Sequence, residues 1–564
     1  MAAAMVRSAL LECQTWDEGI HLAAGYSYLK TGQFRLNAEH PPLFKLLAAL
    51  PLLLLRPELP TQHPSWATAN VFDFAVQFMY GNRVDADTIL FWGRSVTILL
   101  TLLLGLALAL WTRRSFGPAP ALAALVLFSL DPNFIAHGHY VTNDLILALF
   151  VFLTVIAWVS FIETRRYRDL LIASLALGAA LVTKYSGLLL AVILPLLYIV
   201  QWAIEWRRRR RGCEAPGRRL SLPHLAVSLM VAAVISVGVI ALAYWPETLR
   251  ALRGGPRLAQ SVTSWTIVGT TFQWLGDRFD LPAHAYLVGA ETLANFSKDG
   301  HDQYLLGSHS RHGWWYYFPV AFAVKTPGAI LMLAALALAA AVWLRRRPAP
   351  EPTAQGGAPA LRWLALILPA ALYFGAMMMS TIDLGVRYIL PVYPFLFILI
   401  AAILFHPALE GFRQARRVVL AVALLFQGFE VASIHPHYLA FFNTFSGGPE
   451  NGPRYLLDSN IDWGQDLKNL RAFLKAIGWQ QPICVCYFGN ASMTYYGIPH
   501  HNLPLTREVG KRQNLDCLAA ISVTPLYNVY VPAGSYDWLR SMKPMAKVGY
   551  SIYVYDLRKN KTPL

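Results

Sequence analysis

The sequence predicts a polytopic α-helical membrane protein with a small α/β domain at its C-terminal end. Of its 564 residues, 56% are hydrophobic and only 14% are charged, and the mean hydropathy is +0.41. This composition is too apolar for a soluble protein of such length. Basic residues lie in short runs between the apolar segments, and the chain becomes more polar after residue 434. These observations together define the fold class.

The formal net charge of +16 does not indicate a nucleic-acid partner. The positive-inside rule places basic runs in the cytoplasmic loops between apolar segments, so the charge indicates membrane topology. We therefore expect the protein to contact membrane lipids and no nucleic acid. The five cysteines indicate neither a disulfide framework nor a zinc site. Cys484 and Cys486 alternate on a predicted strand and point the same way, so a disulfide to Cys517 is conceivable.

The first apolar stretch, residues 41–56, is shorter than the roughly 20 residues that cross a bilayer, and it contains Lys45. We expect it to lie at the membrane interface. The first complete span is predicted at 88–111 and is followed by Arg113 and Arg114. This end should therefore lie in the cytoplasm and everything before it outside.

Apolar spans and basic loops then alternate as far as residue 434. The basic loops predict about ten crossings that begin and end outside. A Pro/Ala/Gly-rich linker at 348–360 should be cytoplasmic and disordered. Further spans are predicted at 118–131 and 143–161. One short span begins at 170 and another ends near 206, and the two are joined by an outer loop at 183–187. The remaining spans are predicted at 222–245, 318–345, 362–381, 388–405 and 418–434.

From residue 435 the pattern is that of a small α/β domain, which should lie outside because the last span ends there. A membrane body (1–434) with an exterior catalytic loop (15–57) is thus followed by an exterior domain (435–564). Its predicted elements are an amphipathic helix near 464–477, strands near 482–488, 517–523 and 548–556, and a helix near 535–541.

Two acidic motifs stand on the first exterior segment. Asp17 and Glu18 are adjacent, and Glu39 and His40 precede two prolines at the start of the interfacial stretch. An acidic pair here could equally be solvated or cap the following helix. The second motif favours a catalytic role, because the prolines fix where Glu39 and His40 point.

Further polar residues gather in the exterior loops, whereas the cytoplasmic loops hold little but arginine. Asp144 opens a span, where it could instead complement the helix dipole. Lys184 lies where two spans meet, and an ammonium at such depth usually has an anionic partner. Arg387 and Tyr388 begin another span. Three histidines and one arginine also precede an aromatic belt at 314–317, namely His301, His309, Arg311 and His312.

This set of residues suits a lipid-borne anionic substrate at the outer membrane surface. Lys184, Arg311 and Arg387 could neutralise a phosphate leaving group. Asp17 is the candidate base that takes the proton from an attacking hydroxyl. Glu39 with His309 could also hold a divalent metal, although the two form no spaced motif. The chemistry itself requires no cofactor.

In this order, the motifs resemble those of the GT-C glycosyltransferases, and among them the group of protein O-mannosyltransferases and aminoarabinose transferases. The resemblance covers about residues 15–435, and the segment 458–466 resembles part of the exterior domain of bacterial members. It rests on Asp17-Glu18, Glu39-His40-Pro41-Pro42, Asn143-Asp144, Thr183-Lys184, His309 before the aromatic belt, and Arg387-Tyr388.

The resemblance implies inverting transfer of a sugar from a polyprenyl-phosphate donor to a protein, lipid or glycan acceptor, outside the plasma membrane. Asp17 and Glu18 would be the catalytic residues, with Asp17 at the position of the catalytic acid, and Glu39 with His309 would lie at a metal position. Phosphate contacts would involve His40, Lys184, Arg311, Arg387 and Tyr388. The family has lysine in place of His40 in its aminoarabinose branch.

The family also has a membrane span before the Asp-Glu loop, whereas only sixteen residues precede Asp17 in this sequence. Either the sequence starts too late or the first span is missing; if it is missing, we expect the loop to lose its anchor and the chain to lose activity.

Two other classes of function fit the sequence less well. A transporter or flippase of lipid-linked sugars would explain Lys325 and Pro327 inside a predicted span, but the chain shows no repeated halves. A membrane-anchored binding domain would not need about ten crossings. In the exterior domain, Asp462, Trp463 and Asp466 could bind an acceptor or could serve packing and helix capping.

Overall fold

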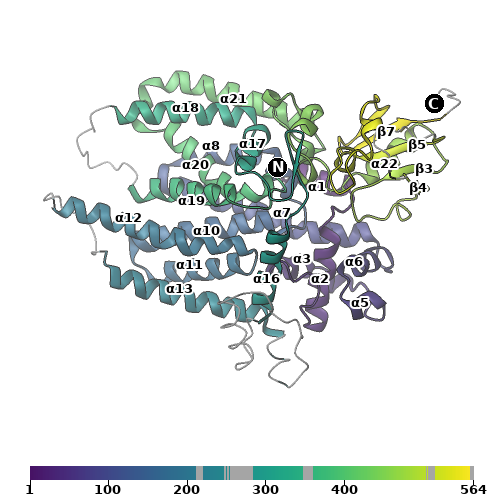
Figure 1. Cartoon of the computed structure of the whole chain (residues 1–564). Helices are drawn as coiled ribbons and strands as arrows, with labels where there is room; N and C mark the ends of the chain where they lie inside the picture. The colour runs from purple at the N-terminus through teal and green to yellow at the C-terminus, as the bar shows by residue number, and fades with distance from the viewer. Residues whose placement is uncertain are drawn as a thin grey trace.

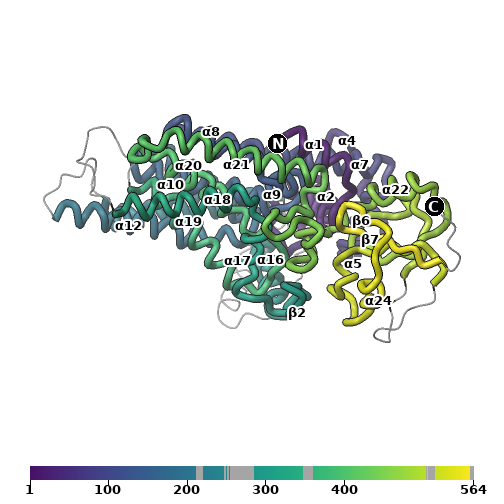
Figure 2. The backbone as a smooth tube through the Cα atoms, turned by 90° about the horizontal axis from the view of Figure 1, so that it is seen from above, coloured from purple at the N-terminus to yellow at the C-terminus, as the bar shows by residue number. Residues whose placement is uncertain are grey.

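The computed structural model describes residues 1–210, 220–246, 249, 253, 284–346, 360–503, 505 and 515–558. Figure 1 shows long helices packed side by side at one end of the molecule and a small sheet at the other. Figure 2 shows the same elongated arrangement from above. Cys213, the predicted linker except Ala360, and most of the loop that follows Trp245 lie outside the described residues.

Eight helical segments in the described part of the chain are long and apolar enough to cross a membrane, which confirms the predicted polytopic helical fold. They are α7 (Ala86–Phe116), α10 (Asn143–Thr164), η1 with α12 (Tyr185–Leu189, Leu190–Arg210), α13 (Leu222–Ala243), α18 (Gly328–Arg345), α19 (Ala360–Met378), η2 with α20 (Val386–Val392, Tyr393–Leu404) and η3 with α21 (Pro407–Phe412, Arg413–Ile434).

Two of the predicted crossings correspond to shorter helices, α8 (Pro118–Ser129) and α11 (Tyr167–Leu181). At about 1.5 Å per residue they are about 18 and 22 Å long, less than the roughly 30 Å of bilayer hydrocarbon. Helix α11 packs between α10 and α13, and α8 packs on α7 and α20. Each shorter helix is therefore packed on two neighbours along part of its surface, while Leu122 of α8 and Leu171 of α11 stay exposed.

The span predicted at 318–345 is two helices, α17 (Tyr317–Lys325) and α18, separated at Pro327. Proline cannot donate a backbone hydrogen bond, so the helix ends before it. Lys325 at the break is buried, and its Nζ donates to the carbonyl oxygens of Leu439 and Asn460, each at 2.8 Å. The lysine that suggested a transport path thus ties the helices to the C-terminal region, residues 435–558.

The C-terminal region contains a mixed five-stranded sheet with the order β4-β3-β5-β7-β6. The three predicted strands and two predicted helices are present, whereas the three-residue strands β4 and β6 were not predicted. Cys484 on β3 forms a disulfide with Cys517, with Cα atoms 6.2 Å apart. The elements are α22 (Leu467–Ala476), β3 (Ile483–Cys486), β4 (His500–Asn502), β5 (Leu518–Ser522), α23 (Val523–Leu526), α24 (Asp537–Arg540), β6 (Ala546–Val548) and β7 (Ile552–Asp556).

The N-terminal segment joins the membrane body to the C-terminal region. Helix α1 (Ala2–Leu11) packs on α7, and beyond it the Cys13 thiol donates to the Gly464 carbonyl at 3.1 Å. The Trp16 amide donates to the Trp463 carbonyl at 2.8 Å. These contacts place the loop that carries Asp17 between the two parts.

The remaining elements are short. The predicted interfacial stretch forms two brief helices, in accord with its length. These elements are α2 (Glu18–Thr31), α3 (Leu43–Ala49), α4 (Leu52–Leu55), α5 (Pro64–Thr68), α6 (Val71–Tyr80), α9 (Pro132–His137), α16 (His284–Asp299), β1 (Gln303–Leu305), β2 (Ser308–Ser310), and the 3-10 turns η4 (Tyr438–Ala440), η5 (Thr444–Ser446), η6 (Pro449–Arg454) and η7 (Asp458–Asn460).

Candidate active site

A cavity of about 450 Å³ lies where the N-terminal loops, the start of η2 and the C-terminal region meet. Its wall combines carboxylates, histidines, one arginine and several aromatic rings. The lining residues are Trp16, Asp17, Ile20, His21, Asn37, Glu39, His40, Val71, Phe72, Leu293, Phe296, His301, Ile382, Leu384, Arg387, Tyr388, Asp458, Trp463, Phe488 and Tyr530.

Asp17 faces this cavity. It occupies the N-cap position of α2, but its side chain makes no capping hydrogen bond. Its Oδ2 instead lies 3.4 Å from Nη1 of Arg387. The helix-capping alternative is therefore not realised, and the carboxylate is available at the cavity wall.

Glu18 has the opposite environment, contrary to the prediction that it is catalytic. Its side chain is fully buried, and Oε2 accepts from Arg94 Nη2 at 2.7 Å and from the Thr15 amide at 2.8 Å. Oε1 accepts from Arg94 Nε at 2.8 Å and from the Val141 amide at 2.9 Å. Because both carboxylate oxygens accept hydrogen bonds from these donors, Glu18 fixes the conformation of the loop. It does not line the cavity.

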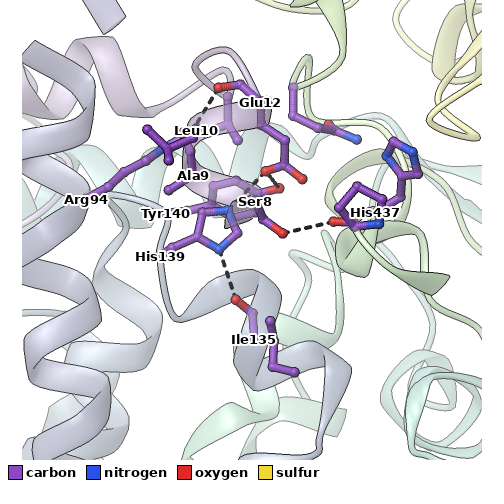
Figure 3. Close-up of polar contacts among 12 residues, drawn as sticks. Ser8, Ala9, Leu10, Glu12, Arg94, Ile135, His139, Tyr140 and His437 are labelled. Carbon is purple, nitrogen blue, oxygen red and sulfur yellow. Dashed lines mark hydrogen bonds and ion pairs between the residues drawn. The ribbon is translucent and has the colours of Figure 1, made fainter. Parts of the chain in front are cut away.

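Arg94 anchors the segment before Asp17. Besides pairing with Glu18, its guanidinium donates to the backbone carbonyls of Ala9, Glu12 and Cys13 at 2.8 to 3.1 Å. Figure 3 shows Arg94 beside the segment that contains Ala9 and Glu12. The loop that carries Asp17 is therefore held from within the chain, at α7.

A second buried cluster holds the same segment, as Figure 3 shows. The Glu12 carboxylate accepts from the Tyr140 hydroxyl at 2.7 Å and lies 3.0 Å from His139 Nε2. Nδ1 of His139 donates to the Ile135 carbonyl at 2.9 Å, and Ser8 donates to the Pro436 carbonyl at 2.9 Å. The residues of this cluster do not line the cavity. Their hydrogen bonds hold the segment that precedes Asp17.

Arg387 is the cation of the cavity. Its guanidinium lies 4.2 Å from the centroid of the Trp463 ring, and Nη1 lies between Asp17 and Asp144, at 3.4 and 3.5 Å. Its buried Nε has no hydrogen-bond partner within the described residues. The fork of Arg387 is thus only partly used by the protein.

Lys184 and Asp144 lie behind the cavity wall and do not line it. Lys184 Nζ is 2.5 Å from Asp144 Oδ1 and 4.0 Å from the centroid of the Tyr388 ring. Asp144 in turn lies beside Arg387. The anionic partner predicted for Lys184 is therefore Asp144. This ion pair contacts Arg387 and Tyr388 and orients them, and both of these residues line the cavity.

Glu39 and His40 line the cavity from the loop between α2 and α3. Nδ1 of His40 is buried without a hydrogen-bond partner in the described part of the chain. Burial, and to a lesser extent Lys184, lower the pKa of His40 well below its ordinary value. Loss of water and the nearby Asp17 carboxylate raise the pKa of Glu39. His40 is accordingly a neutral imidazole.

Lys45 fixes the loop that carries these two residues. Its buried ammonium donates to the Asn37 carbonyl at 2.6 Å and to Asn37 Oδ1 at 3.0 Å. Burial lowers the pKa of Lys45 to about 7, and Glu39 offsets part of this effect.

The lowered pKa of Lys45 predicts a stability that rises with pH. From about pH 7 to the ordinary lysine value of 10.5, the unfolded chain binds more protons at this site than the folded chain does. The free energy of unfolding should therefore increase across this window, by on the order of a few kcal/mol, and level off below it. Thermal unfolding of wild type and Lys45→Gln tests this. Parallel curves for the two proteins would contradict the assignment.

Two predicted residues lie away from the cavity. Arg311 is exposed, and only its carbonyl serves the site, accepting from the amide of His301 at 2.9 Å. His309 is exposed on β2 and is not among the residues that line the cavity. Among the described residues, no group of three or more His, Cys, Asp or Glu side chains could hold a metal ion. Of the two predicted ligands, Glu39 lines the cavity and His309 does not, so the residues there do not fit the predicted metal site.

Several lining residues were not predicted as site residues. His21 lies four residues after Asp17, so helical spacing could have identified it. Its Nδ1 donates to the Val141 carbonyl at 2.7 Å, and burial lowers its pKa to about 4. Asp458, Phe488 and Tyr530 come from three separate loops of the C-terminal region, for which the sequence offers no spacing signal.

Comparison with known proteins gives one family match. The family model described as dolichyl-phosphate-mannose-protein mannosyltransferase matches residues 87–240. This match confirms the resemblance predicted from the motifs over the residues that it covers. A comparison with curated proteins finds no significant match.

Some solved structures are similar to the chain at low identity. ArnT from Cupriavidus metallidurans bound to undecaprenyl phosphate is 15% identical, with a TM-score of 0.42, over 99% of this chain and 97% of that one. Its apo state gives 14% identity and a TM-score of 0.44 over the same shares. Archaeal oligosaccharyltransferase AglB from Archaeoglobus fulgidus, in complex with an inhibitory peptide and a dolichol-phosphate, is 13% identical, with a TM-score of 0.39, over 78% of this chain and 55% of that one.

Proposed function

We propose that this protein is a membrane glycosyltransferase that moves a sugar from a polyprenyl-phosphate donor to a hydroxyl group of a protein, lipid or glycan acceptor. The observation that carries the proposal is the placement of Asp17 and Arg387 3.4 Å apart on the wall of one cavity. Transfer of a sugar to a hydroxyl needs these two functions, a base for the acceptor and a cation for the departing phosphate. The family match over residues 87–240 supports the same class of reaction.

The donor phosphate would bind at Arg387. Its buried Nε and the buried Nδ1 of His40 are polar atoms without a hydrogen-bond partner in the described chain, and both residues line the cavity. Guanidinium groups bind phosphate through paired hydrogen bonds, and a neutral imidazole can donate one more. Lys184 and Asp144 would keep the guanidinium oriented from behind the wall.

Asp17 would act as the general base. The acceptor oxygen attacks the anomeric carbon, its proton passes to the Asp17 carboxylate, and the bond from carbon to the phosphate oxygen breaks. The phosphate leaves with the bonding electron pair, and Arg387 stabilises the charge. Attack on the face opposite to the phosphate gives inversion at the anomeric carbon. A phosphate acceptor would need no base, so a hydroxyl acceptor suits Asp17 better.

We place the cavity at the outer face of the membrane. The basic runs at the ends of α7 and α12 favour the cytoplasmic side for those ends, and the cavity lies at the other ends of the bundle. The disulfide between Cys484 and Cys517 also suits an oxidising exterior compartment.

Donor cleavage by purified protein tests the proposal. We expect release of polyprenyl phosphate from radiolabelled polyprenyl-phosphate mannose when a membrane extract supplies acceptors, with the label passing to an acceptor. A transporter of lipid-linked sugars would move the intact donor across vesicle membranes without cleaving it. Movement without cleavage would therefore replace the transferase by the transporter.

The shape of the Arg387 fork should matter in addition to its charge. Arg387→Lys keeps a cation but loses the planar fork and the stacking on Trp463. We expect kcat/KM for the donor to fall by about 10- to 100-fold, largely through a higher KM. Steady-state kinetics at varied donor concentration measures this, with the exposed Arg311→Lys as the matched control. An unchanged KM would show that phosphate binds elsewhere.

A further inference from the structure

The C-terminal region contributes a polar cluster to the cavity that the proposed reaction has not used. We propose that Asp458, Tyr530 and His301 bind hydroxyl groups of the transferred sugar and determine which sugar is accepted. This inference rests on the proposed function and assigns to the C-terminal region the choice of glycosyl group.

The three residues form a hydrogen-bonded chain on the cavity wall. The Tyr530 hydroxyl donates to Asp458 Oδ2 at 2.5 Å, and it lies 2.8 Å from His301 Nε2. Because the single hydroxyl proton goes to the carboxylate, Nε2 must donate to Tyr530. Asp458 Oδ1 accepts from the Ser459 amide at 2.5 Å. Each carboxylate oxygen retains a lone pair, which can accept from a sugar hydroxyl.

The backbone at this cluster is in an uncommon conformation. Asp458 and Tyr530 both have positive φ, 55° and 63°, in the left-handed region that side chains other than glycine rarely adopt. Tertiary contacts must hold two such residues in place, and residues of this kind concentrate at binding sites. These two residues lie at the point where two loops distant in the sequence meet through the Tyr530–Asp458 hydrogen bond.

The cluster lies where the sugar must be. The anomeric carbon is bonded to the donor phosphate, so a phosphate on Arg387 places the sugar ring beside that arginine. Trp463 of the C-terminal region stacks on Arg387, and Asp458 lines the same cavity as both of these residues. The sugar ring therefore reaches the wall that Asp458 and Tyr530 form.

An aromatic wall adjoins these polar groups. Phe488 stacks on Trp16 with centroids 5.1 Å apart and on Tyr530 with centroids 5.3 Å apart, and all three rings line the cavity. A binding site with apolar walls and a few convergent polar groups fixes a ligand in one orientation. The flat rings suit the apolar face of a sugar, while Asp458 accepts from its edge.

The charge of Asp458 gives further support. Loss of water raises the pKa of this carboxyl group, and the hydrogen bond from Tyr530 offsets only part of the effect. A carboxylate that has lost water gains from each new hydroxyl donor. A sugar can supply such donors, whereas the lipid tail of the donor cannot.

Donor analogues separate sugar recognition from a purely structural role. The probes are polyprenyl-phosphate mannose, glucose and galactose, followed by the 2-, 3-, 4- and 6-deoxy forms of the best donor. We expect loss of one hydroxyl to lower the wild-type kcat/KM by about 10- to 100-fold. In Asp458→Asn and Tyr530→Phe, the loss of kcat/KM caused by removing that hydroxyl should shrink to less than about threefold. The reason is that the group that binds the hydroxyl is already altered in these variants.

The controls and outcomes are distinct. Asp302→Asn and Tyr527→Phe, which do not line the cavity, should retain the wild-type pattern of deoxy-sugar penalties. Tyr530→Phe keeps the stacked ring and serves if Asp458→Asn does not fold. If the wild type cleaves donors and both variants keep its pattern, or if no deoxy sugar is penalised, the inference is overturned and the proposed function stands. If the wild type cleaves none of the donors, the proposed function itself fails, and the inference with it.

Discussion

Replacement of Asp17 by asparagine should lower the rate of sugar transfer by about 10²- to 10⁴-fold, the range expected for loss of a general base. Asparagine has nearly the same shape but cannot take a proton from the acceptor hydroxyl. Arg387 would lose one of its two carboxylate neighbours and keep Asp144. Donor binding should therefore change little or become slightly tighter, because the phosphate no longer competes with Asp17 for the guanidinium.

Single-turnover transfer and equilibrium binding of a radiolabelled polyprenyl-phosphate sugar would measure the two effects separately. Glu58→Gln is the matched control, since Glu58 is an exposed acid on the same N-terminal part of the chain and does not line the cavity. A rate close to wild type for Asp17→Asn would remove Asp17 as the base. Equal losses of rate and of donor affinity would instead indicate that Asp17 supports the phosphate site.

Replacement of Arg94 by leucine should be the most destabilising single change in the N-terminal segment. It would leave the fully buried Glu18 carboxylate without its ion-pair partner, and three backbone carbonyls without their donor. Removing one partner of a buried pair costs about 3–5 kcal/mol. Because Arg94 holds the segment before Asp17, transfer activity should be lost together with stability.

A double replacement distinguishes the buried charge from loss of packing. If the unpaired carboxylate is the cause, Arg94→Leu combined with Glu18→Leu should be more stable than Arg94→Leu alone. Thermal unfolding in detergent measures this. Arg83→Leu breaks an exposed pair with Glu58, 3.7 Å apart, and should have little effect. An Arg94 variant as stable as the Arg83 variant would show that the buried pair does not anchor the loop.

The membrane architecture could be predicted from local patterns. A membrane span is predicted from consecutive apolar residues and from the basic run that follows them. Both signals lie within a short stretch of sequence. For this reason each predicted crossing corresponds to helix in the described residues, although α8 and α11 are shorter than a span and eight segments are long enough to cross. The sequence shows the proline at 327, where the predicted span divides into two helices. It does not show that Lys325 beside this break bonds to the carbonyls of Leu439 and Asn460.

Part of the candidate site was also predictable. Asp17, Glu39, His40, Arg387 and Tyr388 stand at or near the starts of elements on one side of the predicted membrane, and all line the cavity. The order of the motifs along the chain was enough to select them. No single motif would have been enough, because each has a structural alternative such as capping or solvation.

The sequence by itself thus predicted the long apolar helices, of which eight in the described part of the chain are long enough to cross a membrane. The tertiary structure alone decided which of the predicted site residues face the cavity. Asp17 and Glu18 are neighbours, yet Arg94 from α7 turns the carboxylate of Glu18 inward and leaves Asp17 free. Lys184 is covered in the same way by Tyr388, and Asp458 and Tyr530 join the site only because their loops meet. The direction of a side chain depends on partners far along the chain, and local spacing does not specify them.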